Sequence, residues 1–234
     1  MQSTETLAYF ERESQQRLNP SLTNPNWLVL RRRREILRAW LSRLPAGDLC
    51  VLDIGGRLQP YRPLLQHRGG LYLALDLRYT PLVSVVGRGE QMPFAAGTFD
   101  FVICTQMLEY APEPAQVISE VYRVLRPGGS LFLSVPSVWL RDSESDAWRF
   151  MPPGLQILLG RFRKAEILPE GSSISGLFRS ILACMVLFAR PPVLGKLLCF
   201  TIVPVLNLAA SGLEWLFPRF NDAFTANFSA WAQK

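Results

Sequence analysis

Short apolar runs, each followed by a polar or glycine-containing turn, fill the middle of the chain. Five of them lie between residues 49 and 136: LCVLDIG (49–55), LYLALD (71–76), LVSVVG (82–87), FDFVICT (99–105) and SLFLSVP (130–136). Runs this continuously apolar are typical of parallel strands, because crossover helices bury both faces of a parallel sheet. Three stretches that each begin at a proline, 60–67, 112–125 and 152–159, are expected to be helices. The pattern predicts an α/β protein with a doubly wound sheet.

Helical patterns precede this region and two further strand patterns follow it. A polar helix is expected to end at Asn19-Pro20, and residues 27–44 carry apolar side chains at helical spacing. The segments 162–171 and 223–234 are expected to be strands. We therefore divide the chain into N-terminal helices (1–48), a core (49–173), a hydrophobic helical insertion (174–217) and a C-terminal strand that completes the core sheet (218–234).

The insertion contains two apolar runs, CMVLFA (184–189), which is too short to cross a bilayer, and LLCFTIVPVLNLAASGL (197–213). The second run approaches the length needed to cross a bilayer, but it contains Pro204, Asn207 and Ser211, and Glu214 follows it. A single crossing would also place the last strand on the wrong side of the membrane. Three interpretations stay open: an interfacial or re-entrant hairpin, a buried helical subdomain or dimer surface, and a true span.

Composition narrows the class of protein. Of the 234 residues 49% are hydrophobic and 19% are charged, which excludes wholesale disorder and a coiled-coil rod. The net charge of +6 suits an anionic membrane surface or an acidic substrate. The arginine run 31–34 is read as a solvated helix face, or alternatively as a contact to anionic lipid or phosphate. A nucleic-acid partner is not expected, because no basic stripe with interleaved aromatic residues follows the predicted crevice.

The four cysteines show no CxxC pair and have apolar neighbours, so we expect buried free thiols and neither a metal site nor a disulfide framework. The first twenty residues include acidic side chains and no apolar core segment, so they do not resemble a secretory signal. A cytoplasmic protein is expected, with peripheral contact at the inner face of the membrane through residues 174–217.

Candidate chemistry lies where the predicted strands end. In an open parallel sheet the ligand binds beyond the carboxyl ends of the strands. The first strand ends in Asp53, followed by Gly55 and Gly56, and the second ends in Asp76, 21 residues after Gly55. A carboxylate at this distance from a glycine turn is placed to bind ribose hydroxyls. Neither GxGxxG nor GxxxxGK[ST] occurs here, which argues against a dinucleotide or ATP and favours a nucleoside without phosphates.

These motifs resemble those of class I S-adenosylmethionine-dependent methyltransferases of the type 11 family. The resemblance rests on VLDIGGRLQPYRPLL (51–65), YLALDL (72–77), VVGRGEQMPFAAGTFDFVICTQMLEYAPEPAQVISEVYRVLRPGGSLFLSVPS (85–137) and DAWRFMPPGLQILL (146–159). It implies a Rossmann-like seven-stranded sheet, mostly parallel with an antiparallel last strand, which suits residues 223–234. It also implies S-adenosyl-L-methionine as the cofactor.

The resemblance assigns cofactor contacts to the ends of the first two strands. Asp53, Gly55 and Gly56 would form the loop against the methionine part of the cofactor. Asp76 would hold the ribose, and Leu77 would lie against the adenine.

Further contacts are implied in the middle of the core. Glu90 and Met92 lie in the segment that flanks the adenine in this family. Cys104, Thr105 and Gln106 end the fourth strand beside the sulfonium. A sulfonium needs oxygen atoms nearby and a pocket poor in water, which these residues are expected to provide.

The sequence departs from the family pattern at four positions. Arg57 replaces the third small residue of the glycine turn. Arg88 stands where an aspartate usually contacts the adenine amino group. Tyr110 and Ser145 replace two histidines. A histidine base is therefore absent at both places.

A general base is expected among the carboxylates and the tyrosine near the crevice mouth. The candidates are Glu109, Tyr110, Asp142, Glu144 and Asp146. Asp146 is preferred because it precedes the Trp-Arg-Phe segment expected over the crevice, and Tyr110 is its predicted partner in catalysis.

The sequence thus predicts a methyltransferase for a small-molecule, glycan or lipid-linked acceptor, working at the membrane surface. A catalytically inactive methyltransferase-like scaffold is the alternative, motivated by the four departures. A nicotinamide-dependent oxidoreductase is disfavoured because the phosphate-binding glycines are missing.

Overall fold

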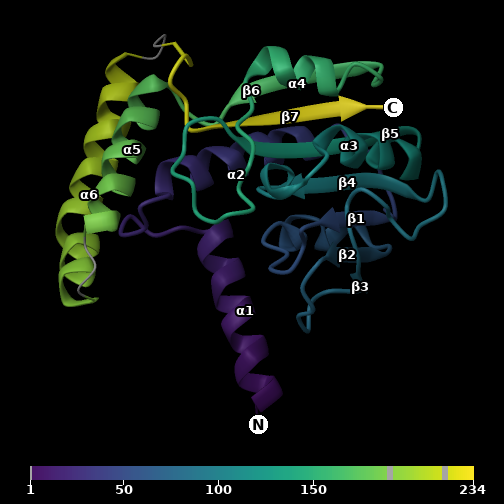
Figure 1. Ribbon diagram of the computed structural model, residues 1–234, viewed down its shortest axis with the longest axis horizontal. Coiled ribbons are helices and arrows are strands. Elements are labelled where there is room, and N and C mark those ends of the chain that lie inside the picture. The colour runs from purple at the N-terminus through teal and green to yellow at the C-terminus, as the bar shows by residue number, and fades with distance from the viewer. Residues whose placement is uncertain (1, 189–191, 218–220) are drawn as a thin grey trace.

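A computed structural model of the chain describes residues 2–188, 192–217 and 221–234 (Figure 1). The strands are β1 (Val51–Ile54), β2 (Tyr72–Asp76), β3 (Val85–Val86), β4 (Phe99–Thr105), β5 (Leu125–Pro136), β6 (Lys164–Pro169) and β7 (Asn227–Gln233). The α-helices are α1 (Gln2–Leu18), α2 (Trp27–Leu41), α3 (Pro114–Val124), α4 (Pro152–Leu158), α5 (Ser173–Phe188) and α6 (Pro192–Leu216). Short 3-10 turns occupy η1 (Arg62–Leu64), η2 (Gln66–Arg68) and η3 (Leu108–Tyr110).

The strands form one seven-stranded sheet in the order β3-β2-β1-β4-β5-β7-β6. Strand β7 lies between β5 and β6 and runs antiparallel to both, whereas the other pairs are parallel. The predicted Rossmann-like fold with an antiparallel last strand is confirmed. Strand order reverses beside β1, which places the ligand-binding crevice at the carboxyl ends of β1 and β4. The division into four segments stays a prediction.

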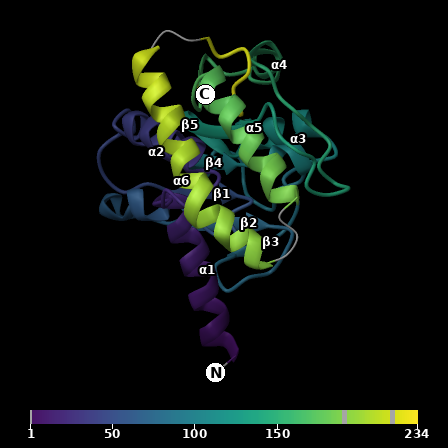
Figure 2. The same cartoon turned by 90° about the vertical axis from the view of Figure 1, so that its left-hand side faces the viewer.

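Two hydrophobic clusters cover the two faces of the sheet. Alternate residues of β4 point to opposite faces, so Phe101 and Ile103 pack with Trp40 of α2, while Val102 packs with Val117 of α3. Both faces of the central strands are therefore buried, which explains their continuous apolar runs. Helix α1 extends away from the sheet in both views (Figures 1 and 2).

The structure corrects two of the predicted elements. Residues 60–67 contain two 3-10 turns instead of an α-helix. The prolines at 60 and 63 explain the difference, because Pro63 has no N–H to donate and its ring disfavours helical geometry at residue 62. The predicted strand 82–87 is reduced to the two residues of β3, which form the edge of the sheet.

The arginine run is not simply a solvated face. Arg31 and Arg32 lie near Glu35 on the surface, but Arg33 is buried and pairs with Glu170 at 2.9 Å. Arg34 donates to Leu18 O at 3.1 Å. Both interpretations of the run are therefore wrong for Arg33.

The expectation for the cysteines is confirmed only in part. All four are free, but only Cys104 is buried, and Cys184 of α5 is exposed. Helical periodicity places Cys184 on the outer side of its helix, which apolar neighbours in the sequence could not reveal.

The apolar insertion forms the hairpin α5–α6, whose helices lie side by side in both views (Figures 1 and 2). The hairpin stands beside the carboxyl ends of the parallel strands, since antiparallel β7 points away from it in Figure 1. Residues 193–216 have a mean hydropathy of 1.9 over the most apolar 18-residue window, of which 17% is buried. By length and composition this one helix could cross a membrane. The expectation of a buried helical subdomain is therefore wrong for α6.

Candidate functional site

A cleft of about 380 Å³ opens at the carboxyl ends of β1, β2 and β4. Five of the predicted cofactor residues line it: Gly55, Asp76, Leu77, Glu90 and Gln106. Arg57 and Arg88, the two basic departures from the family pattern, line it as well. The cleft therefore lies at the reversal of strand order, where an open α/β sheet binds its ligand.

Backbone geometry keeps the cleft open beside β1. Gly55 has a φ of +75°, which favours glycine, and a Cβ atom there would lie 2.8 Å from Cβ of Met107. Asp76 uses one carboxylate oxygen to accept the N–H of Arg78 at 2.8 Å. Its other oxygen has no partner among the described residues and can accept hydrogen bonds from a ligand.

A second cavity of about 500 Å³ adjoins the cleft on the side of α2 and α5. The two spaces share five lining residues: Gly55, Arg57, Gln106, Tyr110 and Asp142. The second cavity is polar, and the predicted site residues Asp53, Thr105 and Asp146 line it. We call it the polar cavity.

Gln106 lies where the cleft and the polar cavity meet. Its backbone has a φ of +50°, an uncommon conformation for a residue with a side chain. Its side-chain amide donates to Ser134 O at 3.3 Å and accepts from Asn227 Nδ2 at 3.3 Å. These contacts hold the strained residue between the two spaces, as is frequent at functional sites.

Two of the buried carboxyl groups that line the polar cavity have raised pKa values. Burial raises the pKa of Asp53 to about 7, although Tyr72 donates a hydrogen bond to it at 2.6 Å. Burial also raises the pKa of Glu109 to about 7, and Glu109 Oε2 has no hydrogen-bond partner in the described part of the chain. Both groups are poised to exchange a proton near neutral pH.

The two predicted catalytic residues are engaged with neighbours. Asp146 pairs with Arg149, and this hydrogen bond lowers the pKa of Asp146. The Tyr110 hydroxyl donates to Asp142 Oδ2 at 2.6 Å, and burial together with this contact raises its pKa. Asp146 is thus a weak base, and Tyr110 stays protonated as a donor.

Comparison with known proteins agrees with this geometry. Residues 52–133 match the family model described as a methyltransferase domain. A ubiquinone biosynthesis O-methyltransferase of Pseudomonas paraeruginosa is 51% identical over 152 residues, which cover 57% of this chain and 60% of that protein. A second protein of this name, from Pseudomonas aeruginosa strain LESB58, is 32% identical over 140 residues, 52% of this chain and 54% of its own. The chain therefore spans little more than half the length of these relatives.

Residues 52–133 are a methyltransferase domain. Solved structures show the same fold over most of the chain. A SAM-dependent methyltransferase from Archaeoglobus fulgidus has a TM-score of 0.52 at 15% identity and covers 86% of this chain and 94% of its own. The cyclase SpnF has a TM-score of 0.58 at 16% identity, and the match covers 89% of this chain and 82% of that one. The Burkholderia thailandensis 1,6-didemethyltoxoflavin-N1-methyltransferase, solved with bound 1,6-didemethyltoxoflavin and S-adenosylhomocysteine, has a TM-score of 0.52 at 14% identity. The match covers 100% of this chain and 87% of that one.

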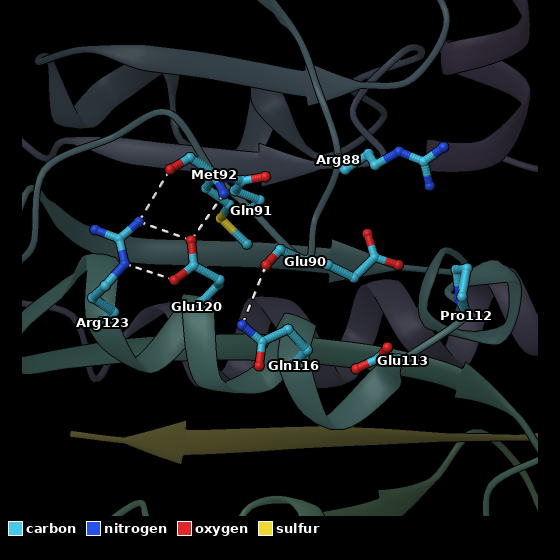
Figure 3. Close-up of a pocket in the computed structure, with 9 residues that line it drawn as sticks. All are labelled: Arg88, Glu90, Gln91, Met92, Pro112, Glu113, Gln116, Glu120 and Arg123. Atoms are coloured by element: carbon cyan, nitrogen blue, oxygen red, sulfur yellow. Dashed lines mark hydrogen bonds and ion pairs between the residues drawn. The ribbon is translucent and has the colours of Figure 1, made fainter.

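A third hollow, of about 660 Å³, lies on the flank of the methyltransferase domain (Figure 3). Met92 lines it, and the backbone N–H of Met92 donates to Glu120 at 2.8 Å. Arg123 forms an ion pair with Glu120 at 2.6 Å, whereas the side chain of Arg88 extends away from this pair. The ion pair neutralises Glu120 and Arg123, whereas Arg88, Glu90 and Glu113 also line the hollow, to which we assign no ligand.

Not every predicted residue of the methyltransferase domain reaches the cleft. Cys104 is fully buried between the sheet and α3, and Met92 is buried at the hollow instead. Gly56 packs against Asp53, where a Cβ atom would lie 2.7 Å from Asp53 O. Among the described residues Gly56 thus shapes the loop from behind and lines none of the three spaces.

A buried charged network behind the polar cavity was missed from the sequence. Glu170 follows β6 and is fully buried, where it accepts hydrogen bonds from Arg33, Ser134 Oγ and Ser229 Oγ. Arg179 of α5 lies close by and lines the cavity. No sequence signal links these residues, because Arg33 and Ser229 lie 196 positions apart.

Proposed function

We propose that this chain transfers a methyl group from S-adenosylmethionine to a small-molecule acceptor. The observation that carries the proposal is the junction at Gln106 between the cleft and the polar cavity. A cofactor in the cleft and an acceptor in the cavity would meet there. Methyl transfer depends mainly on holding nucleophile, carbon and sulfur in line, which two adjoining sites accomplish.

The residues of the cleft fit the proposed cofactor. Asp76 offers a free carboxylate oxygen for ribose hydroxyls, and Leu77 presents an exposed apolar side chain for the adenine. Gly55 leaves open the space that a side chain would fill. Arg57 and Arg88 also line the cleft and add two positive charges to it.

The acceptor side suits a hydroxyl nucleophile. S-adenosylmethionine supplies a methyl group on a sulfonium and is left as S-adenosylhomocysteine. The attacking oxygen must lose its proton, and we assign Glu109 to accept it, since its pKa lies near neutrality and one oxygen is free. Asp146 holds Arg149 instead. The two Pseudomonas relatives are named O-methyltransferases, which favours the same acceptor atom.

The acceptor is proposed to arrive at a membrane surface, which brings lipid-linked acceptors within reach. The outer side of α6 is apolar over about 37 Å, and its most exposed side chains include Phe200, Val205 and Trp215. Two inward contacts argue against a crossing: Asn207 donates to Leu22 O at 2.8 Å, and Glu214 accepts from Ser172 N at 2.9 Å. We therefore propose that α6 lies in the interface.

Hydrogen–deuterium exchange with and without S-adenosylhomocysteine tests the proposal. Protection is expected at residues 53–57, 76–78, 87–91 and 105–107, which border the cleft, while α4 serves as an internal control. Protection confined to other segments, or no protection at millimolar ligand, would contradict it.

A further inference from the structure

The polar cavity contains a buried arginine whose charge is not balanced. Arg179 is 6% exposed and lines the cavity from α5. Arg33 is also buried, and among the described residues Glu170 is the one carboxylate that forms an ion pair with either of these two guanidinium groups. Glu170 contacts Arg33 through both of its oxygens. Two buried positive charges therefore face one negative charge.

The other carboxylates that line the cavity do not balance Arg179. Asp146 pairs with Arg149, Asp142 accepts from Tyr110, and Asp53 accepts from Tyr72. Glu109 has a pKa near 7 and is partly neutral, and Glu13 of α1 interacts with Arg17. Among the described residues none forms an ion pair with Arg179. An unpaired buried charge is costly, so it is retained where a ligand pairs with it.

The contacts of Arg179 leave one edge of its guanidinium without a partner among the described residues. The indole of Trp139 lies 3.6 Å from the guanidinium carbon and covers one face. Nε donates to Asn26 Oδ1 at 3.1 Å, and Nη1 donates to Asn227 Oδ1 at 3.3 Å. Nη2 has no hydrogen-bond partner among the described residues. Burial and the neighbouring Arg33 lower the pKa of Arg179 to about 9, so the group remains charged at neutral pH.

We propose that the polar cavity binds a phosphate group of the acceptor on Arg179, with Trp139 and Asn26 holding the guanidinium in place. This inference rests on the proposed function for the identity of the ligand as acceptor. A phosphate is a better match than a neutral group, because a guanidinium binds phosphate oxygens through charge-assisted hydrogen bonds. The phosphate can belong to a soluble ester or to a lipid that reaches the cavity past the α5–α6 hairpin.

Inorganic phosphate and dioctanoyl phosphatidic acid below its micelle concentration are the probes. Calorimetric titration and thermal melting at constant ionic strength should show binding by the wild type. Arg179→Met should weaken this binding by about 10- to 100-fold, and Arg179→Lys should retain part of it. Arg161→Met is the matched control, because Arg161 also stacks on an aromatic ring, Tyr122 at 4.5 Å, but is exposed outside the cavity.

Thermal melting without ligand separates this role from a purely structural one. A ligand-binding arginine costs stability, so Arg179→Met should melt at the same or a higher temperature than the wild type. A lower melting temperature, with phosphate binding retained by the Lys and Met variants alike, would overturn the proposal. If the Met variant does not fold, undiminished phosphate affinity in Arg179→Lys would overturn it.

The two probes and the cofactor distinguish the remaining outcomes. Binding of phosphatidic acid alone, lost in Arg179→Met, supports a lipid phosphate, and binding of inorganic phosphate supports a soluble ester. No binding of either probe by protein that binds S-adenosylhomocysteine would overturn the phosphate site and leave the proposed function intact. Phosphate binding by protein that does not bind S-adenosylhomocysteine would overturn the proposed function and leave the phosphate site intact.

Discussion

The most informative residues of the site are buried groups that need a ligand or a proton. Glu109 is 3% exposed with a free oxygen, and Arg179 lacks an anionic partner among the described residues. Each is unfavourable in the protein alone, and such groups cluster at functional sites. These two groups therefore mark where a proton and an anionic ligand are expected to bind.

Replacement of Glu109 by Gln should stabilise the protein at alkaline pH. The pKa of Glu109 rises from 4.5 to about 7 on folding, so ionisation of the folded protein costs free energy. The contribution of the neutral Glu109 carboxyl to the free energy of unfolding is fully present below pH 4.5 and is lost as the pH rises through 7. Glu109→Gln should therefore exceed the wild type by about 1–3 kcal/mol at pH 8 and match it at pH 4. Urea unfolding between pH 4 and pH 8 measures the difference in the free energy of unfolding between the two proteins. A difference that does not change with pH would contradict the assigned pKa.

Replacement of Gly55 by Ala should weaken cofactor binding more than tenfold. The added Cβ atom would lie 2.8 Å from Cβ of Met107. The alanine would also have to adopt a backbone φ of +75°. Gly97→Ala is the matched control, because Gly97 has a φ of +66° and open space around it. Both variants should lose about 1 kcal/mol of stability, but only Gly55→Ala should lose more than tenfold in affinity for S-adenosylhomocysteine. Equal affinities would contradict the role of Gly55.

At the level of residues the sequence predicted the cleft better than the polar cavity. Gly55 and Asp76 follow strands at fixed spacing, so local sequence is enough to place them together. The carboxylate preferred as base, Asp146, was chosen by position along the chain, and its ion pair with Arg149 could not be seen there. Arg179 reaches the cavity from the apolar insertion, a segment without any motif for this chemistry.

Among the elements, the central strands follow directly from the apolar pattern, and β4 coincides with the predicted run 99–105. The connection after β1 does not follow from the sequence pattern, because its prolines favour 3-10 turns where the pattern predicts an α-helix. The position of β7 between β5 and β6 depends on pairing across almost a hundred residues. Residue patterns predict local elements, whereas such long-range contacts required the resemblance to a known fold.

Helix α6 should depend on Asn207 for its attachment. Asn207→Leu removes hydrogen bonds to Leu22 O and Asn24 O, and should lower the free energy of unfolding by about 1–2 kcal/mol. Thr201→Leu is the control, since Thr201 is exposed on the same helix and bonds only to Leu197 O. Thermal melting compares the two variants. An equal or higher stability of Asn207→Leu would favour a helix that leaves the protein for the bilayer.

In the whole molecule, the α5–α6 hairpin joins an apolar outer surface to the edge of the sheet that carries the site (Figure 1). Arg179 projects from the inner side of the same hairpin into the polar cavity. One insertion can therefore contact a membrane and line the acceptor site. This arrangement connects the two proposals.

Flotation with phosphatidylglycerol vesicles tests the membrane contact. The double variant Phe200→Glu, Val205→Glu places two charges on the outer face of α6, where both side chains are exposed. Each substitution removes about 1.5–3 kcal/mol of the free energy gained when an apolar side chain enters the membrane. Vesicle binding should therefore fall more than tenfold. Ile157→Glu, at an apolar position of α4 that is even more exposed, should float like the wild type. Undiminished flotation of the double variant would contradict the interfacial placement of α6.

The central claim, that the cleft binds S-adenosylmethionine through Asp76, is tested most directly by calorimetric titration with S-adenosylhomocysteine. The wild type should bind, and Asp76→Ala should bind about 10- to 100-fold more weakly, because a charged hydrogen-bond acceptor is lost. Asp222→Ala, an exposed aspartate outside the cleft, should bind like the wild type. Equal affinity of the two variants, or no binding by folded wild type at millimolar ligand, would contradict the account.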